Sequence, residues 1–176
     1  MSRPRCRCRP APRRTGRLAV NILILYDSRF GNTHRLADAM GSAISSEHSV
    51  TTRAISGVPT DAAWFDLVLV GGPTHAHGAS ASLKEALQQL PKGSLAGVHA
   101  AVFDTRFRMP KVLSGSAAQA AAKLLRRAGA EVVDPVESFF VTRATPPELD
   151  PGEDTRAAAW AHHIVAWVSP QWAAPV

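Results

Sequence analysis

Residues 20–33, VNILILYDSRFGNT, decide the fold class. The first seven are almost all apolar and rich in β-branched side chains, which is typical of a strand covered on both faces. Residues 33–46 then place four apolar side chains on one face of a helix: Leu36, Ala39, Met40 and Ala43. A buried strand, a short loop and an amphipathic helix together predict the start of a βαβ unit.

The same alternation continues along the chain. Further strands are predicted at residues 49–55 (of edge type), 66–71, 98–103 and, interrupted at Pro135, 131–133 and 137–142. Helices are predicted at residues 80–90, 115–128 and 153–168, and one short turn at Asp61–Trp64. This order indicates an α/β fold, a doubly wound, mostly parallel sheet of five strands with helices on both faces. Ligands bind beyond the carboxyl ends of such strands, so the site is expected in loops 27–33, 72–79 and 104–113.

Charge divides the chain into two parts. The net charge of +6 arises in residues 1–17, which hold seven arginines and no acid, whereas residues 18–176 carry 13 basic and 14 acidic side chains. We expect residues 1–17 to be a disordered tail and residues 18–170 to be one domain. The tail fits a solvated segment without a role, a start codon placed too far upstream, or an electrostatic arm for acidic partners. The domain itself gives no indication of nucleic-acid binding.

Cysteine content and hydropathy exclude several classes of protein. Cys6 and Cys8 are the only cysteines, so a disulfide framework is excluded, and a reducing, cytoplasmic location is expected. No apolar run approaches the roughly 20 residues of a membrane span. G-x-S-x-G, H-E-x-x-H and C-x-x-C motifs are absent, and no catalytic residue or metal site is predicted.

The loop between the first strand and the first helix has the chemistry of an anion site. It lacks the G-x-G-x-x-G and G-x-x-x-x-G-K-[ST] nucleotide motifs. Gly31 permits a tight turn that exposes backbone N–H groups at a helix N-terminus, and Ser28 and Thr33 offer hydroxyl donors. The alternative is that Ser28, Asn32 and Thr33 only cap the helix.

The segment YDSRFGNTHRLADAM resembles the phosphate-binding segment of the flavodoxin family, a hydroxyl-x-Thr-Gly-x-Thr loop after the first strand. Ser28, Gly31 and Thr33 match its first, fourth and sixth positions. Phe30 stands where the family often has Thr, and Arg29 adds a charge. The resemblance covers roughly residues 19–168. It implies a flavodoxin-like sheet of order 2-1-3-4-5, with flavin mononucleotide (FMN) as cofactor.

Two further loops carry the resemblance. Residues 71–78, GGPTHAHG, are similar to the Gly-x-Pro-Thr-(Tyr/Trp/His) segment that lines the flavin ring in this family. It implies ring contacts from Pro73, Thr74, Gly78 and a stacking histidine, His75 or His77. The third loop implies hydrogen bonds to the pyrimidine edge from Asp104 and Thr105, with Phe107 stacking on the ring and Arg106 as a further cofactor-binding residue. The alternatives are a hydrated histidine loop without a role and a Phe107 that packs into the helix below.

Two classes of function follow from the resemblance, and the electron carrier is favoured over the enzyme. The first is an FMN-bound carrier that passes electrons between redox partner proteins. The second is a small FMN-dependent oxidoreductase for a quinone, a protoporphyrinogen or another small anionic substrate. A flavodoxin-like fold that binds no flavin is a third outcome. A basic rim is expected from His75, His77, Arg106 and Arg108, and it predicts a less negative potential for the last reduction step of the flavin.

Overall fold

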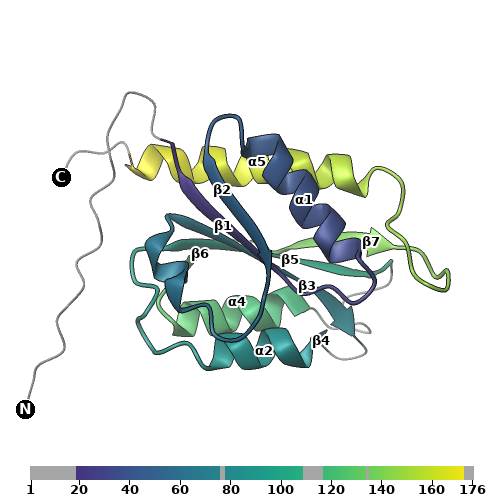
Figure 1. Ribbon diagram of the computed structural model, residues 1–176, viewed down its shortest axis with the longest axis horizontal. Coiled ribbons are helices and arrows are strands. Elements are labelled where there is room, and N and C mark those ends of the chain that lie inside the picture. The colour runs from purple at the N-terminus through teal and green to yellow at the C-terminus, as the bar shows by residue number, and fades with distance from the viewer. Residues whose placement is uncertain (1–18, 76–77, 109–116, 134, 173–176) are drawn as a thin grey trace, which may run out of the picture.

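The computed structural model describes residues 19–75, 78–108, 117–133 and 135–172. The predicted tail and His77 lie outside this part of the chain. A single sheet forms the centre of the described structure (Figure 1).

The sheet confirms the predicted parallel topology. Its strands are β1 (Asn21–Tyr26), β2 (Ser49–Ala54), β3 (Leu67–His75) and β5 (His99–Phe107), in the order β2-β1-β3-β5. The last position is shared by β6 (Glu131–Val132) and β7 (Glu137–Val141), which both pair with β5 in parallel. They are the two pieces of the interrupted strand that the sequence predicts. When β6 and β7 are counted as one strand and the short β4 is left out, the strand order of the sheet is 2-1-3-4-5. The two-residue strand β4 (Gly78–Ala79) turns back antiparallel on β3.

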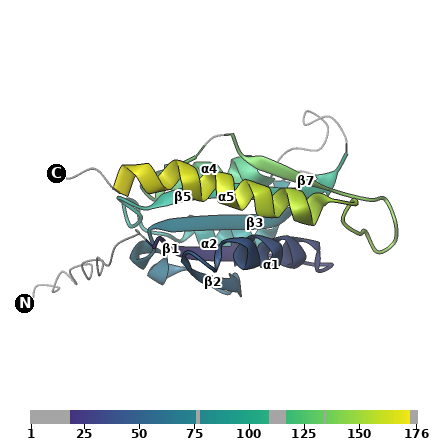
Figure 2. The same ribbon diagram turned by 90° about the horizontal axis from the view of Figure 1, so that it is seen from above.

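Helices cover both faces of the sheet. Helices α1 (Asn32–Ile44) and α5 (Glu153–Trp172) pack together on one face, and α2 (Ala81–Gln88) and α4 (Ala117–Arg127) on the other (Figures 1 and 2). The short 3-10 helix η1 (Thr60–Trp64) occupies the predicted turn. None of the helices in the described ranges is long and apolar enough to cross a membrane.

Alternation along β1 divides the hydrophobic core in two. Ile22 and Ile24 pack under α1 and α5, whereas Leu23 and Leu25 pack under α2 and α4. All four side chains are at most 1 % exposed, which confirms the strand buried on both faces. On α5, Trp160 and Ile164 pack against the first of these two parts of the core, whereas Trp167 is 45 % exposed.

Two strands extend further than the sequence predicts. Strand β3 continues to His75 instead of ending at residue 71, and β5 continues to Phe107 instead of residue 103. Glycine suggests a turn after residue 71, but a Cβ at Gly71 would overlap the Phe103 ring, and one at Gly72 would overlap Leu83. The two glycines therefore do not mark a turn. They continue the strand, and their lack of a side chain leaves room for Phe103 and Leu83 to pack against it. The predicted second loop contracts to the β3–β4 hairpin.

Candidate functional site

A cavity of about 160 Å³ lies at the carboxyl ends of the parallel strands. This is the place that the strand order predicts for a ligand. Ten residues that the sequence predicts line the cavity: Ser28, Arg29, Phe30, Asn32, Thr33, Pro73, Thr74, Thr105, Arg106 and Phe107. Two further lining residues, Val141 and Pro147, were not predicted.

The loop from β1 to α1 presents an uncapped helix N-terminus. The N-cap residue is Gly31, with φ 83°, a left-handed conformation that glycine adopts without strain. Within the described residues no side chain caps this helix and its first turn holds no acid, so the alternative of a capping role for Ser28, Asn32 and Thr33 is not observed. The first N–H groups of α1 therefore keep their capacity to bind an anion.

Ser28 adds a donor at the same place. Its Oγ is buried and has no hydrogen-bond partner among the described residues, although Ser28 lines the cavity. A buried hydroxyl without a partner is costly, because its lost hydrogen bonds to water are not replaced. A phosphate oxygen in the cavity would satisfy Ser28, so this donor fits the phosphate group of FMN.

Two threonine hydroxyls lie at the wall of the cavity. Thr33 Oγ1, on the first turn of α1, is 3.2 Å from Thr105 Oγ1 on β5. The two residues are only 1 % and 5 % exposed. This pair joins the first turn of α1 to the strand whose end was predicted to contact the flavin ring.

Asp104 does not line the cavity. It is fully buried on the opposite face of the sheet from Thr105, where its Oδ2 accepts hydrogen bonds from the Thr74 hydroxyl at 2.9 Å and the Ala118 N–H at 3.2 Å. The Ala117 N–H donates in turn to Thr74 Oγ1. Asp104 therefore holds the first turn of α4 against β3 and β5 and is not placed for the predicted contact with a flavin.

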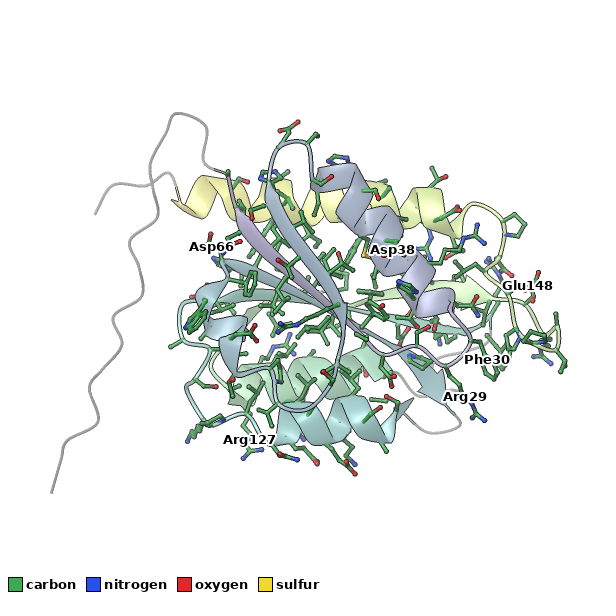
Figure 3. The ribbon with its side chains drawn as sticks, in the orientation of Figure 1. Arg29, Phe30, Asp38, Asp66, Arg127 and Glu148 are labelled. Atoms are coloured by element: carbon green, nitrogen blue, oxygen red, sulfur yellow. The ribbon has the colours of Figure 1, made fainter. Side chains whose placement is uncertain are left out.

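Exposed phenyl rings border the cavity. Phe30 is 50 % exposed and Phe107 is 38 % exposed, so Phe107 does not follow the alternative of packing into the helix below. The guanidinium of Arg29 lies 5.3 Å from the centre of the Phe30 ring. The backbone of His75 ends β3 and pairs with Gly78 in the hairpin. Figure 3 shows Arg29 and Phe30 at the opposite end of the molecule from Asp66, which precedes β3.

The basic groups differ from the predicted rim. Arg106 is buried in the lining, 6 % exposed, with its guanidinium 5.7 Å from the Phe140 ring. Arg108 is exposed but pairs with Asp150 at 3.2 Å. The lining therefore holds two arginines, Arg29 and Arg106, and none of its described residues is acidic. The described residues also hold no cluster of three or more potential metal-binding side chains.

A comparison with known proteins identifies the family of this chain. The model of the flavodoxin domain family matches residues 23–134, more than half of the chain, including the β1–α1 loop and the ends of β3 and β5. The chain belongs to the flavodoxin domain family. No curated protein matches its sequence.

Solved structures share the fold of this flavodoxin-family chain at low sequence identity. Oxidised Flavodoxin 1 from Bacillus cereus is 18 % identical, with a TM-score of 0.68 over 83 % of this chain and 97 % of that one. A Fusobacterium nucleatum flavodoxin bound to flavin mononucleotide is 14 % identical, with a TM-score of 0.62 over 82 % and 96 %. The rubredoxin oxygen:oxidoreductase of Desulfovibrio gigas is 17 % identical, with a TM-score of 0.60 over 88 % of this chain and 37 % of that one.

The segment after β7 forms a wall that the sequence analysis missed. In this flavodoxin-family chain, Leu149 bridges back to Val141, and Thr142 N–H donates to the Glu148 carbonyl at 2.8 Å. The Asn32 side chain donates to the Pro147 carbonyl at 2.9 Å and ties this segment to α1. The sequence could have indicated this wall. All parallel strands end at the same edge of the sheet, so the segment after the last strand begins beside the cavity.

Proposed function

We propose that the cavity binds FMN and that the protein transfers electrons between redox partners. The observation that carries the proposal is the buried Ser28 hydroxyl, which has no hydrogen-bond partner in the described part of the chain and precedes a helix N-terminus without a side-chain cap there. An anion at this position would accept hydrogen bonds from Ser28 and from the first N–H groups of α1. The membership in the flavodoxin domain family supports a flavin phosphate as this anion.

The first loop holds the phosphate in this proposal. Ser28 and Thr33 donate hydroxyl protons, Gly31 and Asn32 bring the backbone close, and Arg29 adds positive charge at the mouth. Phe30 replaces a donor that the family often has, and its exposed ring extends the apolar border of the cavity.

The second and third loops hold the ring in this proposal. Phe107 stacks on one face of the flavin, as offset aromatic pairs do. Pro73, Thr74 and Gly78 border the ring edge, and His75 or His77 supplies the stacking histidine that the sequence implies. Arg106 adds a positive charge close to the ring.

The flavin supplies the redox chemistry, because its ring system accepts and releases electrons. The protein binds it, orients it and limits its contact with water. No catalytic residue is assigned to the chain, and the partners in this function are proteins that exchange electrons with the bound flavin.

An alternative is a small FMN-dependent oxidoreductase with a quinone, protoporphyrinogen or other anionic substrate. The observation that favours it is the lining itself, which combines Arg29 and Arg106 with no described acid and would attract a negative charge. A similar fold also forms part of a protein named as an oxidoreductase. Steady-state turnover with quinones and a nicotinamide donor separates the two functions, since rapid turnover by the isolated protein favours the enzyme.

The visible absorption spectrum of the purified protein tests the proposal directly. We expect a yellow protein, or a colourless one that becomes yellow and quenches flavin fluorescence after incubation with FMN. Ser28→Ala should weaken this binding, whereas Ser42→Ala, on the exposed surface of α1, should leave it unchanged. A protein that stays colourless with excess FMN is a flavodoxin-like fold that binds no flavin, and the proposal is then wrong.

A further inference from the structure

The contact between Thr33 and Thr105 defines how many hydrogen-bond donors face the cavity. The two hydroxyl oxygens lie 3.2 Å apart, and either can be the donor. Two hydroxyls have two protons, and their mutual hydrogen bond uses one of them. One proton therefore remains for a ligand, and the direction of the mutual bond decides which threonine offers it.

A ligand anion at the N-terminus of α1 favours one of these two directions. Thr33 lies in the first turn of α1, beside the first N–H groups of the helix, whereas Thr105 lies on β5. If Thr105 donates to Thr33, the Thr33 proton is directed to the anion, and a charged acceptor strengthens that bond. If Thr33 instead donates to Thr105, a lone pair of the Thr33 oxygen faces the anion, and the two negative charge distributions repel each other.

We propose that Thr105 is a positioning residue, which donates to Thr33 and thereby directs the Thr33 hydroxyl proton to the phosphate of the bound flavin. The inference rests on the proposed function and assigns Thr105 a role different from the contact with the pyrimidine edge that the sequence implies. The single Thr105 proton is used by Thr33 and is not available to the ring. The effect of Thr105 then depends on the phosphate and not on the ring.

Riboflavin, which has the ring but no phosphate, separates the two roles. The experiment measures the dissociation constants of FMN and riboflavin for the full chain and for Thr105→Val, which keeps the shape of the side chain and removes the hydroxyl. We expect Thr105→Val to weaken FMN about tenfold, the effect of one hydrogen bond to a charged group. Riboflavin binding should be unchanged, and Thr105→Ser should restore FMN binding. The same change at an exposed position of the edge strand, Thr51→Val, should alter neither constant.

A second comparison tests whether Thr105 acts through Thr33. In a Thr33→Val background, Thr105→Val should cause no further loss of FMN affinity, because the group that it positions is gone. If Thr105→Val does not fold, Thr105→Ala replaces it in both comparisons.

Three results would overturn the inference: an equal loss of FMN and riboflavin affinity, which places Thr105 on the ring; no loss of either; or additive losses in the double variant. Failure of the proposed function is distinct from these, because the unmodified protein would then bind neither flavin.

Discussion

The Thr74 hydroxyl donates a 2.9 Å hydrogen bond to Asp104 Oδ2. The two side chains also accept hydrogen bonds from the first two N–H groups of α4, Thr74 from Ala117 and Asp104 from Ala118. Thr74 and Asp104 thus act together as the anchor of α4 at the end of the sheet. The carboxylate also suits this position, because a negative charge is favourable at a helix N-terminus.

Removal of this anchor should destabilise the fold. We expect Asp104→Ala to lower the free energy of unfolding by about 1–3 kcal/mol, because it leaves buried donors without an acceptor. Urea denaturation followed by circular dichroism measures the change. Asp38→Ala, at an exposed position of α1, should change the stability much less. An Asp104→Ala protein as stable as the unmodified chain would show that Asp104 does not anchor α4.

Arg29 should contribute to FMN affinity through its charge. It lines the cavity, and its guanidinium lies 5.3 Å from the centre of the Phe30 ring, so the edge of the guanidinium can approach a phosphate. We expect Arg29→Ala to weaken FMN binding more at low salt than at high salt, because salt screens an exposed charge. Fluorescence titration at two ionic strengths measures this, with Arg127→Ala, on the exposed surface of α4, as the control. Equal weakening at both ionic strengths would contradict a role for the charge.

An ion pair between the two helices of one face predicts a dependence of stability on pH. Arg35 of α1 donates to Asp154 Oδ2 of α5 at 2.7 Å, and this hydrogen bond lowers the pKa of Asp154 below its ordinary value of 3.8. A carboxyl with a lowered pKa in the folded state stabilises the protein above its ordinary pKa, and the contribution is lost as pH falls through the lowered value.

The Arg35→Ala variant should therefore be less stable than the unmodified chain near neutral pH. The difference should be small, because both side chains are exposed, and it should disappear as the pH falls through the folded pKa of Asp154. Thermal unfolding across this range measures it, and Asp154→Asn is the matched variant. A difference that persists in strong acid would contradict the ion pair as its cause.

The sequence was sufficient for the fold because burial leaves a strong periodic signal. A strand covered on both faces is almost continuously apolar, and β1 shows this pattern in Ile22, Leu23, Ile24 and Leu25. The position of the site followed from the strand order alone. The sequence also located its main loop, since the residue types from Ser28 to Thr33 suit an anion at a helix N-terminus.

The parts that the sequence did not predict depend on contacts between distant residues. Gly71 indicates either a turn or close packing, and only the position of the Phe103 ring shows that it is packing. Once β5 extends to Phe107, alternation along the strand directs Asp104 to the α4 side, where it accepts a hydrogen bond from the Ala118 N–H, and Thr105 to the α1 side, where it contacts Thr33. The contact of Asn32 with Pro147 joins residues that are 115 positions apart, and no local pattern encodes it.

Arg106 should raise the potential of the last reduction step of the bound flavin. Its side chain is 6 % exposed and lines the cavity, whereas the side chain of Arg108 is exposed. A positive charge stabilises an anionic reduced flavin, and burial limits the screening of this effect by water and salt. We expect Arg106→Gln to make this potential more negative, by an amount on the order of tens of millivolts, at saturating FMN. Potentiometric titration measures the shift against the unmodified holoprotein, with Arg127→Gln as the exposed control. An unchanged potential in Arg106→Gln, or a strongly negative potential in the unmodified protein, would show that the arginines of the cavity do not set the potential of the flavin.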